Sequence, residues 1–331
     1  MKKIIRVTKP SLPSINEYFN LSKKIWSTGI LTHNGPYVQK FEKDLKKSLK
    51  VNNLSVVANG TLAIQLAIKS LNLKGEIITT PFTWIATIDA IIWEKCKPIF
   101  VDVELDTFNI NPDLIEKKIT KHTVAILGVH TFSNPCNDEK IGKIAKKHDI
   151  KVIYDAAHSM FANYKKKTIL SYGDVSATSL HATKILNSVE GGVCISKNQT
   201  LDKKIKKIRF FGFDNKGVIK NFGTNAKMTE MHAIMGILNL KNIKKILSER
   251  KRQYLLYLNY LKNNPSISFQ NFNKDKYNYS YMPIIVKNNK RLNQLIKLLK
   301  KNNYFPRRYF YPSLNKIKKL GVKKRFKNSE Y

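Results

Sequence analysis

The chain has 331 residues, of which 42% are hydrophobic, enough for one large domain with a smaller partner or for two medium ones. No stretch approaches the roughly 18 apolar residues of a membrane-spanning helix, and the basic N-terminal segment lacks the apolar core of a signal peptide. Cys96, Cys136 and Cys194 are odd in number and far apart, which matches neither a disulfide framework nor a metal site. We therefore expect a cytoplasmic protein with reduced cysteines, no membrane partner and no metal.

The charge is strongly unbalanced, because 60 Lys and Arg residues stand against 23 Asp and Glu, for a net charge of +37. Basic surfaces can bind nucleic acids by neutralising phosphates. Here, however, the lysines are spread along the whole chain and alternate with Ile, Leu and Asn, which is typical of solvated helix faces. We therefore expect no nucleic-acid partner, with nucleic-acid binding kept as a minor alternative, and a positive field that attracts an anionic substrate.

Short β-branched runs alternate with amphipathic segments between about residues 50 and 200. The seven runs are LSVVA (54–58), EIITT (76–80), PIFVD (98–102), TVAILG (123–128), KVIYD (151–155), VSATSL (175–180) and GVCIS (192–196). Helical patterns over 61–71, 112–120 and 138–148 lie between them. This alternation predicts an α/β fold with a mostly parallel seven-stranded sheet covered on both faces. Ligands of such sheets bind beyond the carboxyl ends of the strands.

The pattern changes after residue 200. A basic helix is predicted over 201–209, followed by a loop, a long apolar helix and a further helix over 243–263. A strand over 279–286 and a helix over 291–302 complete the outline. We therefore predict a large domain over residues 1–240 and a smaller C-terminal α/β domain over 241–331.

The first two strand ends carry groups that could bind a flat, phosphorylated ligand. Asn59, Gly60 and Thr61 follow the first run at the start of a helix, where free N–H groups favour phosphate. Taken alone, these residues are explained more simply by an ordinary turn and helix cap. Trp84 follows the second run and could stack on a planar ligand or fill the core.

Two later strand ends carry ionisable groups. Asp155 ends a buried run, and a buried carboxylate needs a partner such as a protonated pyridine nitrogen, unless it caps the next segment. Ser179 and Lys184 follow the next run, between two apolar strands. Most lysines lie on the surface, but a lysine at this position could form a Schiff base, and Ser179 could bind a phosphate.

In combination, these segments resemble the DegT/DnrJ/EryC1/StrS family of sugar aminotransferases, which have the fold-type-I architecture of pyridoxal 5′-phosphate enzymes. The similar segments are NGPYVQKFEKDL (34–45), ANGTLAIQLA (58–67), TTPFTWIAT (79–87), PIFVDVELDTFNINPDLI (98–115), VIYDAAHS (152–159), SLHATKILNSVEGG (179–192), GTNAKMTEMHAIMG (223–236) and RRYFYP (307–312). They extend through nearly the whole chain and occur in the family's order.

The resemblance implies the catalytic roles. Lys184 matches the lysine that holds the cofactor as a Schiff base and later moves a proton, and Asp155 matches the carboxylate that bonds the pyridine nitrogen. His158 falls beside the ring hydroxyl, and Trp84 matches the aromatic residue that stacks on the ring.

The resemblance also implies a phosphate site and a dimer. Gly60, Thr61 and Ser179 match the residues that bind the cofactor phosphate. Asn225 matches an asparagine that reaches the phosphate in the neighbouring subunit, so a homodimer with shared active sites is implied.

Arg307, Arg308 and Tyr309 lie in a segment that resembles the substrate side of the family's site. The implied reaction moves the amino group of glutamate to a nucleotide-linked keto-sugar. The stretch GVHTFSNPCNDEKI (128–141) is most similar to the subgroup that converts dTDP-4-keto-6-deoxyglucose to dTDP-4-amino-4,6-dideoxyglucose for surface polysaccharides. Relatives that aminate position 3 share most of these motifs and remain an alternative.

Members of the family usually continue past a segment like RFKNSEY with another strand and helix, so we expect a truncated chain or an abbreviated small domain. Two further alternatives stay within the family. A sugar dehydratase would carry histidine in place of Lys184, which argues against that reaction. A catalytically decayed member that only binds the cofactor or a partner is the other.

Overall fold

The computed structural model describes residues 4–214, 216–219, 221–271, 277–322 and 324–330. Its centre is a seven-stranded sheet with the order β2-β10-β9-β6-β5-β3-β4. The strands are β2 (Leu54–Val57), β3 (Glu76–Thr79), β4 (Lys97–Phe100), β5 (Thr123–Val129), β6 (Lys151–Asp155), β9 (Val175–Ser179) and β10 (Gly192–Ser196). Only β10 runs antiparallel to its neighbours β2 and β9. The predicted α/β fold with a mostly parallel seven-stranded sheet is confirmed.

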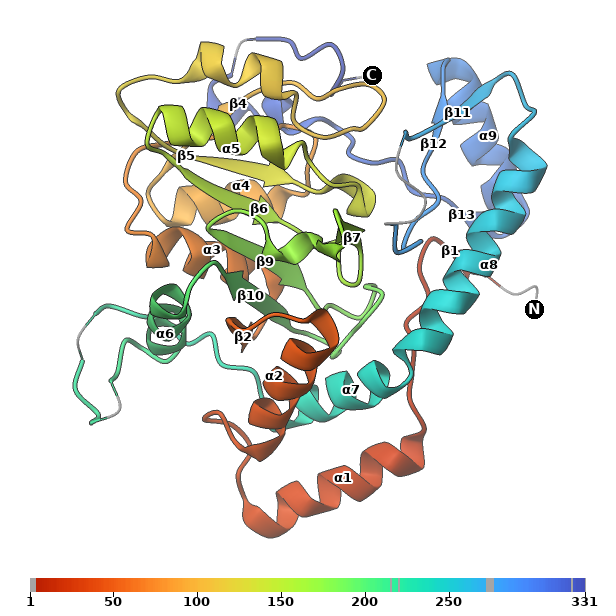
Figure 1. The fold of residues 1–331 in the computed structure, drawn as a ribbon. Helices are drawn as coiled ribbons and strands as arrows, with labels where there is room; N and C mark the ends of the chain where they lie inside the picture. The colour runs from red at the N-terminus through yellow and green to blue at the C-terminus, as the bar shows by residue number, and fades with distance from the viewer. Residues whose placement is uncertain (1–3, 215, 220, 272–276, 323, 331) are drawn as a thin grey trace.

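Helices cover both faces of this sheet (Figure 1). One face packs on α3 (Gly60–Ser70), α4 (Ile85–Trp93) and α6 (Gln199–Ile208), and the other on α2 (Pro36–Leu49), α5 (Asp138–Lys147) and α7 (Glu230–Lys241). The core on the α3, α4 and α6 side is called the first core, and the core on the opposite side the second core. Successive residues of a strand point to opposite faces, so Ile77 belongs to the first core and Ile78 to the second. Both faces are buried, which explains the nearly continuous apolar runs in the sequence.

Polar side chains start several of these helices. Asn59 accepts the N–H of Leu62 at 2.9 Å at the start of α3, and Asn137 and Thr229 cap α5 and α7 in the same way. Such a cap replaces a hydrogen bond that the first turn of a helix cannot make within itself. The helix-cap interpretation of Asn59 is therefore confirmed.

Two elements differ from the sequence prediction. The predicted helix over 112–120 is wrong, because the segment forms two short 3₁₀ turns, Pro112–Leu114 and Glu116–Lys118. A segment this short has little intrinsic helical stability, and its turns bury Ile115 in the second core. The predicted strand over 279–286 is shortened to β12 (Ile284–Val286). At its predicted start, Tyr279 has a left-handed backbone with φ of +56°, which a strand does not contain.

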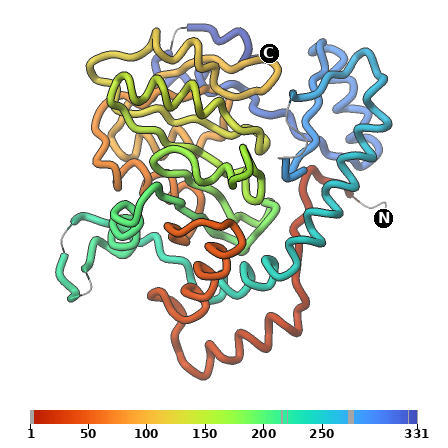
Figure 2. The backbone as a smooth tube through the Cα atoms, in the orientation of Figure 1, coloured from red at the N-terminus to blue at the C-terminus, as the bar shows by residue number. Residues whose placement is uncertain are grey.

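The C-terminal part begins with α8 (Ile243–Leu261), which corresponds to the helix predicted over 243–263. It continues with the hairpin of β11 (Ile267–Phe269) and β12 and with α9 (Asn289–Lys301). Near the N-terminus, β1 (Ile5–Arg6) pairs in parallel with β13 (Tyr304–Phe305), so β1 lies beside this part (Figure 2).

The chain then returns to the large sheet. Leu314 and Phe326 belong to the first core, and the Phe326 ring packs edge-on against Phe100 with centroids 6.1 Å apart. Asp102 accepts hydrogen bonds from the backbone N–H groups of Asn328 and Ser329. The C-terminal segment is thus bound to the sheet, and the domain boundary at residue 240 stays a prediction.

Candidate active site

The sheet brings three of the singled-out strand ends together. Asp155 lies opposite Ala177 on the neighbouring parallel strand β9, two residues before Ser179. Gly60 starts α3 directly beside Ser179, because a Cβ atom added to Gly60 would lie 2.9 Å from the Cβ of Ser179. Any larger residue at position 60 would push the helix start away from Ser179.

The start of α3 and Ser179 together form a cradle for an anion. Asn59 already bonds the N–H of Leu62, and the N–H groups of Gly60 and Thr61 belong to the first turn, which has no intrahelical acceptors. The Ser179 hydroxyl accepts the N–H of His181 at 3.2 Å, so its proton is available to a ligand. These donors and the helix dipole fit a phosphate group.

Asp155 is a buried carboxylate with 5% of its surface exposed. Its Oδ2 accepts the Thr87 hydroxyl at 2.7 Å, and its Oδ1 accepts the backbone N–H of Ala157 at 3.0 Å. Burial raises the pKa of Asp155, while these hydrogen bonds and the charge of Lys184 oppose that rise. Both bonded donors are uncharged, so the carboxylate fits a cationic ligand group such as a protonated ring nitrogen.

Lys184 lies in the turn after β9, which folds back through the hydrogen bond from its N–H to the carbonyl of His181 (2.8 Å). Burial lowers the pKa of Lys184 to about 8, with Asp155 opposing this shift and Arg307 adding to it. A lysine with this pKa is partly neutral near physiological pH. Its amine can therefore act as a nucleophile and as a base.

His158 lies three residues after Asp155 and is held in one orientation. Its Nδ1 accepts the backbone N–H of Phe132 at 3.2 Å, and the two rings are stacked with centroids 5.7 Å apart. Burial and the charge of Lys184 hold the pKa of His158 well below its usual range. The imidazole is therefore neutral, and because Nδ1 accepts, Nε2 carries the proton and can donate it to a ligand oxygen.

Trp84 is placed to present a ring face, since 52% of its surface is exposed at the start of α4. The Arg307 guanidinium lies 4.6 Å from the Trp84 ring centroid and 5.2 Å from that of Tyr309. Arg308 points elsewhere, donating to Asn289 at 2.8 Å and lying over Tyr311. Of the three predicted substrate residues, Arg307 therefore lies beside Trp84, and Tyr309 contacts Arg307.

Asn225 lies apart from this group. It is exposed, forms an isolated bridge with Phe210 and accepts a hydrogen bond from Lys227. This position is open to another molecule, and the role of Asn225 toward a neighbouring subunit stays a prediction.

Sequence reasoning missed several residues around the site. Thr87 contacts Asp155, and Phe132, Tyr281 and Phe310 surround His158. Thr87 could have been found, because it lies one helical turn beyond Trp84. The aromatic residues come from loops far apart in sequence, so no local pattern identifies them.

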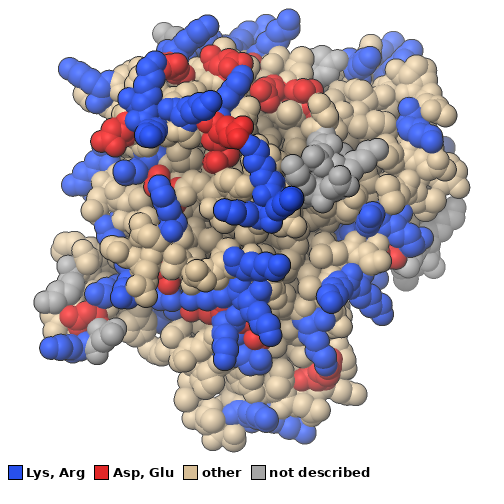
Figure 3. Space-filling view, in the orientation of Figure 1, with Lys and Arg blue, Asp and Glu red and all other residues tan. Residues whose placement is uncertain are grey.

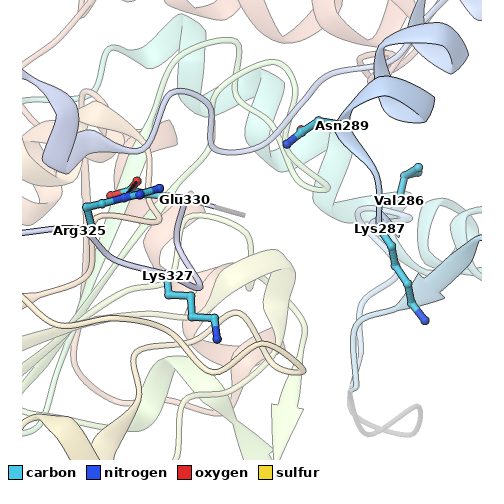
Figure 4. A pocket seen from close by; sticks show the side chains of 6 residues that line it. All are labelled: Val286, Lys287, Asn289, Arg325, Lys327 and Glu330. Atoms are coloured by element: carbon cyan, nitrogen blue, oxygen red, sulfur yellow. Dashed lines mark ion pairs between the residues drawn. The ribbon is translucent and has the colours of Figure 1, made fainter.

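Two basic hollows lie outside this constellation. One, of about 490 Å³, lies between β12 and the C-terminal segment and is lined by Val286, Lys287, Asn289, Arg325, Lys327 and Glu330 (Figure 4). The other, of about 560 Å³, includes Lys203, Arg209 and Lys227 in its lining. On the face in Figure 3, basic side chains are spread widely with acidic ones among them. Neither hollow is lined by Lys184 or Asp155.

Within the described ranges, no helix combines the length and apolar character needed to cross a bilayer. The same part of the chain holds no group of three or more His, Cys, Asp or Glu side chains suited to a metal ion.

The lysine of lowered pKa, the buried carboxylate and the helix-start cradle lie at one edge of this sheet. Their chemistry fits pyridoxal phosphate: the cradle would suit its phosphate, the carboxylate its ring nitrogen and the amine its aldehyde.

Comparisons with known proteins agree. The profile described as the DegT/DnrJ/EryC1/StrS aminotransferase family matches residues 14–330, and the chain belongs to this family. It is 39% identical to a dTDP-4-amino-4,6-dideoxy-D-glucose transaminase of Shigella dysenteriae over 94% of this chain and 86% of the relative. A transaminase of the same name from Escherichia coli is also 39% identical, over 95% and 86%.

Solved structures give the same result for the fold. DesI, crystallised in the presence of its TDP-sugar product, superposes with a TM-score of 0.94 at 26% identity, over 100% of this chain and 86% of DesI. PseC of Helicobacter pylori superposes with a TM-score of 0.90 at 24% identity, over 99% of this chain and 92% of PseC, which supports the fold alone. The chain is a sugar aminotransferase, and its cofactor is pyridoxal 5′-phosphate.

Proposed function

We propose that the protein transfers the amino group of glutamate to dTDP-4-keto-6-deoxyglucose, giving dTDP-4-amino-4,6-dideoxyglucose for a surface polysaccharide. The observation that carries the substrate is the 39% identity, over almost the whole chain, to two transaminases named for this product. The net charge of +37 supports a nucleotide-linked, and therefore anionic, substrate.

When bound, the cofactor supplies an electron-withdrawing ring that stabilises negative charge at the carbon that loses its proton. Lys184 Nζ would hold the cofactor through its aldehyde until the amino group of glutamate displaces it. The freed amine would then move a proton from the α-carbon of glutamate to the cofactor in the first half-reaction, and from the cofactor to C4 of the sugar in the second. Asp155 keeps the ring nitrogen protonated. The lowered pKa of Lys184, to about 8, supports its role because the neutral amine is the reactive form.

The remaining residues bind and orient. Gly60, Thr61 and Ser179 hold the phosphate, Trp84 stacks on the ring, and His158 donates from Nε2 to the ring hydroxyl. Support comes from the short approach of Gly60 to Ser179 and from the exposed ring of Trp84. Arg307, beside Trp84, and Tyr309, which contacts Arg307, are assigned to the substrate.

The active protein is proposed to be a homodimer in the cytoplasm. Large apolar side chains exposed on the monomer support a partner surface, and they include Phe19, Trp26, Trp93 and Phe222 with 55%, 70%, 76% and 88% of their surface exposed. Asn225, three residues after Phe222, is also exposed. The three buried free thiols suit a reducing compartment.

The cofactor assignment is tested by loading the protein with pyridoxal phosphate, reducing it with borohydride and mapping the peptides by mass spectrometry. We expect the cofactor mass on Lys184 and its loss in Lys184→Ala. Turnover of Lys184→Ala should fall by about 10⁴-fold or more, since one group serves as nucleophile and base. Labelling that persists in Lys184→Ala would contradict the assignment.

The substrate is tested with glutamate and a panel of 3-keto and 4-keto nucleotide sugars, with the product analysed by mass spectrometry and NMR. We expect amination at C4 of dTDP-4-keto-6-deoxyglucose. Amination at C3 of another sugar would replace this substrate without removing the cofactor assignment, and cofactor labelling without turnover on any sugar would favour a decayed enzyme.

The shared site is tested by subunit complementation. Lys184→Ala and Asn225→Ala are each purified, mixed under conditions that allow subunits to exchange, and assayed. A hybrid dimer would contain one site with both Lys184 and Asn225 intact, so activity should exceed that of either parent. Monomers in analytical ultracentrifugation, or no recovery despite proven exchange, would contradict the shared site.

A further inference from the structure

Two buried threonines connect the Asp155 carboxylate to the loop that carries Trp84. Thr87, in the first turn of α4, donates its hydroxyl proton to Asp155 Oδ2 at 2.7 Å. The hydroxyl oxygen of Thr83 lies 2.8 Å from that of Thr87. Thr87 is fully buried and Thr83 is 2% exposed, so solvent does not replace either hydroxyl.

The direction of these hydrogen bonds follows from counting protons. An ionised carboxylate only accepts, and each hydroxyl has a single proton. The proton of Thr87 is used on Asp155, so the contact between the two threonines requires Thr83 to donate to Thr87. The hydroxyls therefore form a chain from Thr83 through Thr87 to Asp155, in which each bond polarises the next.

This chain favours the charged form of Asp155 at a place where burial opposes it. Burial raises the pKa of Asp155, and the Thr87 hydrogen bond is the largest influence that lowers it. The facing charged group is Lys184, whose charge is lost as the pH rises through its pKa of about 8. His158 is held neutral. The threonine hydroxyls act at any pH.

The same chain fixes the position of the stacking residue. Trp84 lies between the two threonines in sequence, and its carbonyl accepts the N–H of Thr87 at 3.1 Å. Movement of the first turn of α4 would therefore shift both the Trp84 ring and the hydrogen bond to Asp155. The carboxylate and the ring face are held by one rigid element.

We propose that Thr83 and Thr87 are positioning residues that keep Asp155 ionised and oriented toward the ring nitrogen of the cofactor. They also fix the position of the Trp84 ring relative to this carboxylate. The inference rests on the proposed roles of Asp155 and Trp84 toward pyridoxal phosphate. Thr87 acts directly on Asp155, and Thr83 acts through Thr87.

The test compares Thr87→Val, Thr87→Ser and Thr83→Val by titrating each cofactor-free protein with pyridoxal phosphate across the pH range. Because a hydrogen bond to a charged group is lost, we expect Thr87→Val to bind the cofactor about tenfold or more weakly. Cofactor binding and the visible absorbance both change below a certain pH. In Thr87→Val, this transition pH should be higher than in the wild type. Thr87→Ser keeps the hydroxyl and should restore both, and Thr83→Val should shift them less.

Thr178→Val is the matched control. The Thr178 hydroxyl is as buried as those of the two threonines, but it donates to the carbonyl of Ala156 at 2.8 Å instead of to the carboxylate. This variant should lose stability without moving the pH dependence of cofactor binding.

The outcomes separate the two proposals. If the wild type takes up no cofactor on Lys184, the proposed function fails and this inference fails with it. If the wild type binds normally and Thr87→Val shows the wild-type affinity and pH dependence, the threonine chain alone is overturned. If Thr87→Val does not fold, Thr87→Ser and Thr83→Val serve as the test. The threonine chain is overturned if Thr83→Val leaves the pH dependence of cofactor binding unshifted and Thr87→Ser does not bind the cofactor as the wild type does.

Discussion

Two of the buried carboxylates in the α/β body, Glu42 and Asp155, have opposite surroundings. Glu42, 8% exposed on α2, accepts from the Arg209 guanidinium at 2.6 Å and from the backbone N–H of Val56 at 3.0 Å. Asp155, 5% exposed, is bonded by a hydroxyl and a backbone N–H. The charge of Glu42 is balanced by a cation within the protein. The hydrogen-bond donors to Asp155 are uncharged, so Asp155 suits a cation supplied by a ligand.

Whether a buried carboxylate serves stability or ligand binding depends on its partner. A carboxylate paired with a buried guanidinium stabilises the fold only as part of the pair, because either charge alone would be costly. Arg209 also donates to the side chain of Asn34 at 2.9 Å, so the pair connects α2, β2 and the end of α6. Asp155 ends a strand at the open edge of the sheet, where ligands of this fold bind.

The largest expected effect is on catalysis. Asp155→Asn keeps the shape of the side chain but removes the charge that holds the ring nitrogen protonated. We expect kcat to fall by about 10²–10³-fold, as for the loss of one preorganised electrostatic partner. Urea unfolding of the cofactor-free variant should show little change in stability. An unchanged kcat would show that the charge of Asp155 has no role in catalysis.

The next effect is on stability and concerns the other carboxylate. Glu42→Gln leaves Arg209 as a buried charge without its anion, so the free energy of unfolding should fall by about 3–5 kcal/mol. Asp44→Asn is the control, since Asp44 forms an ion pair with Lys40 on the solvent side of the same helix, and its effect should be far smaller. An equally small effect of Glu42→Gln would show that the buried pair is not structural.

The smallest effect is a pH dependence. The folded protein releases the Lys184 proton near its pKa of about 8, and the unfolded chain does so near 10.5. Between these values the unfolded state binds more protons, so Lys184 makes the folded state progressively more stable as the pH rises. Cofactor-free wild type should therefore gain stability relative to Lys184→Met across this window and show its full disadvantage below it.

The measurement is a set of urea unfolding curves for the two proteins at matched pH values. The titrating groups that do not interact with Lys184 contribute equally to both proteins, so their contributions cancel in the difference. Parallel pH profiles would mean that the Lys184 ammonium is not desolvated in the folded protein.

The amino-acid sequence alone was sufficient to predict the seven strands and the helix cap at Asn59. It was also sufficient to identify Lys184 and Asp155 as candidate site residues. Each of these depends on neighbours within a few positions: apolar runs set by burial on both sheet faces, a polar cap before a helix, or a charge at a strand end. The failed helix over 112–120 shows the limit, since its apolar spacing is satisfied by two short turns.

Tertiary packing decided what local pattern cannot encode. Only the assembled sheet places Gly60 against Ser179, turns Arg307 toward Trp84 while Arg308 turns to α9, and closes the hydroxyl chain from Thr83 to Asp155. The lowered pKa of Lys184 belongs to the same level, because it arises from burial by segments distant in sequence. A pKa and a hydrogen-bond partner depend on what surrounds a group in space, and those surroundings form only when distant parts of the chain meet.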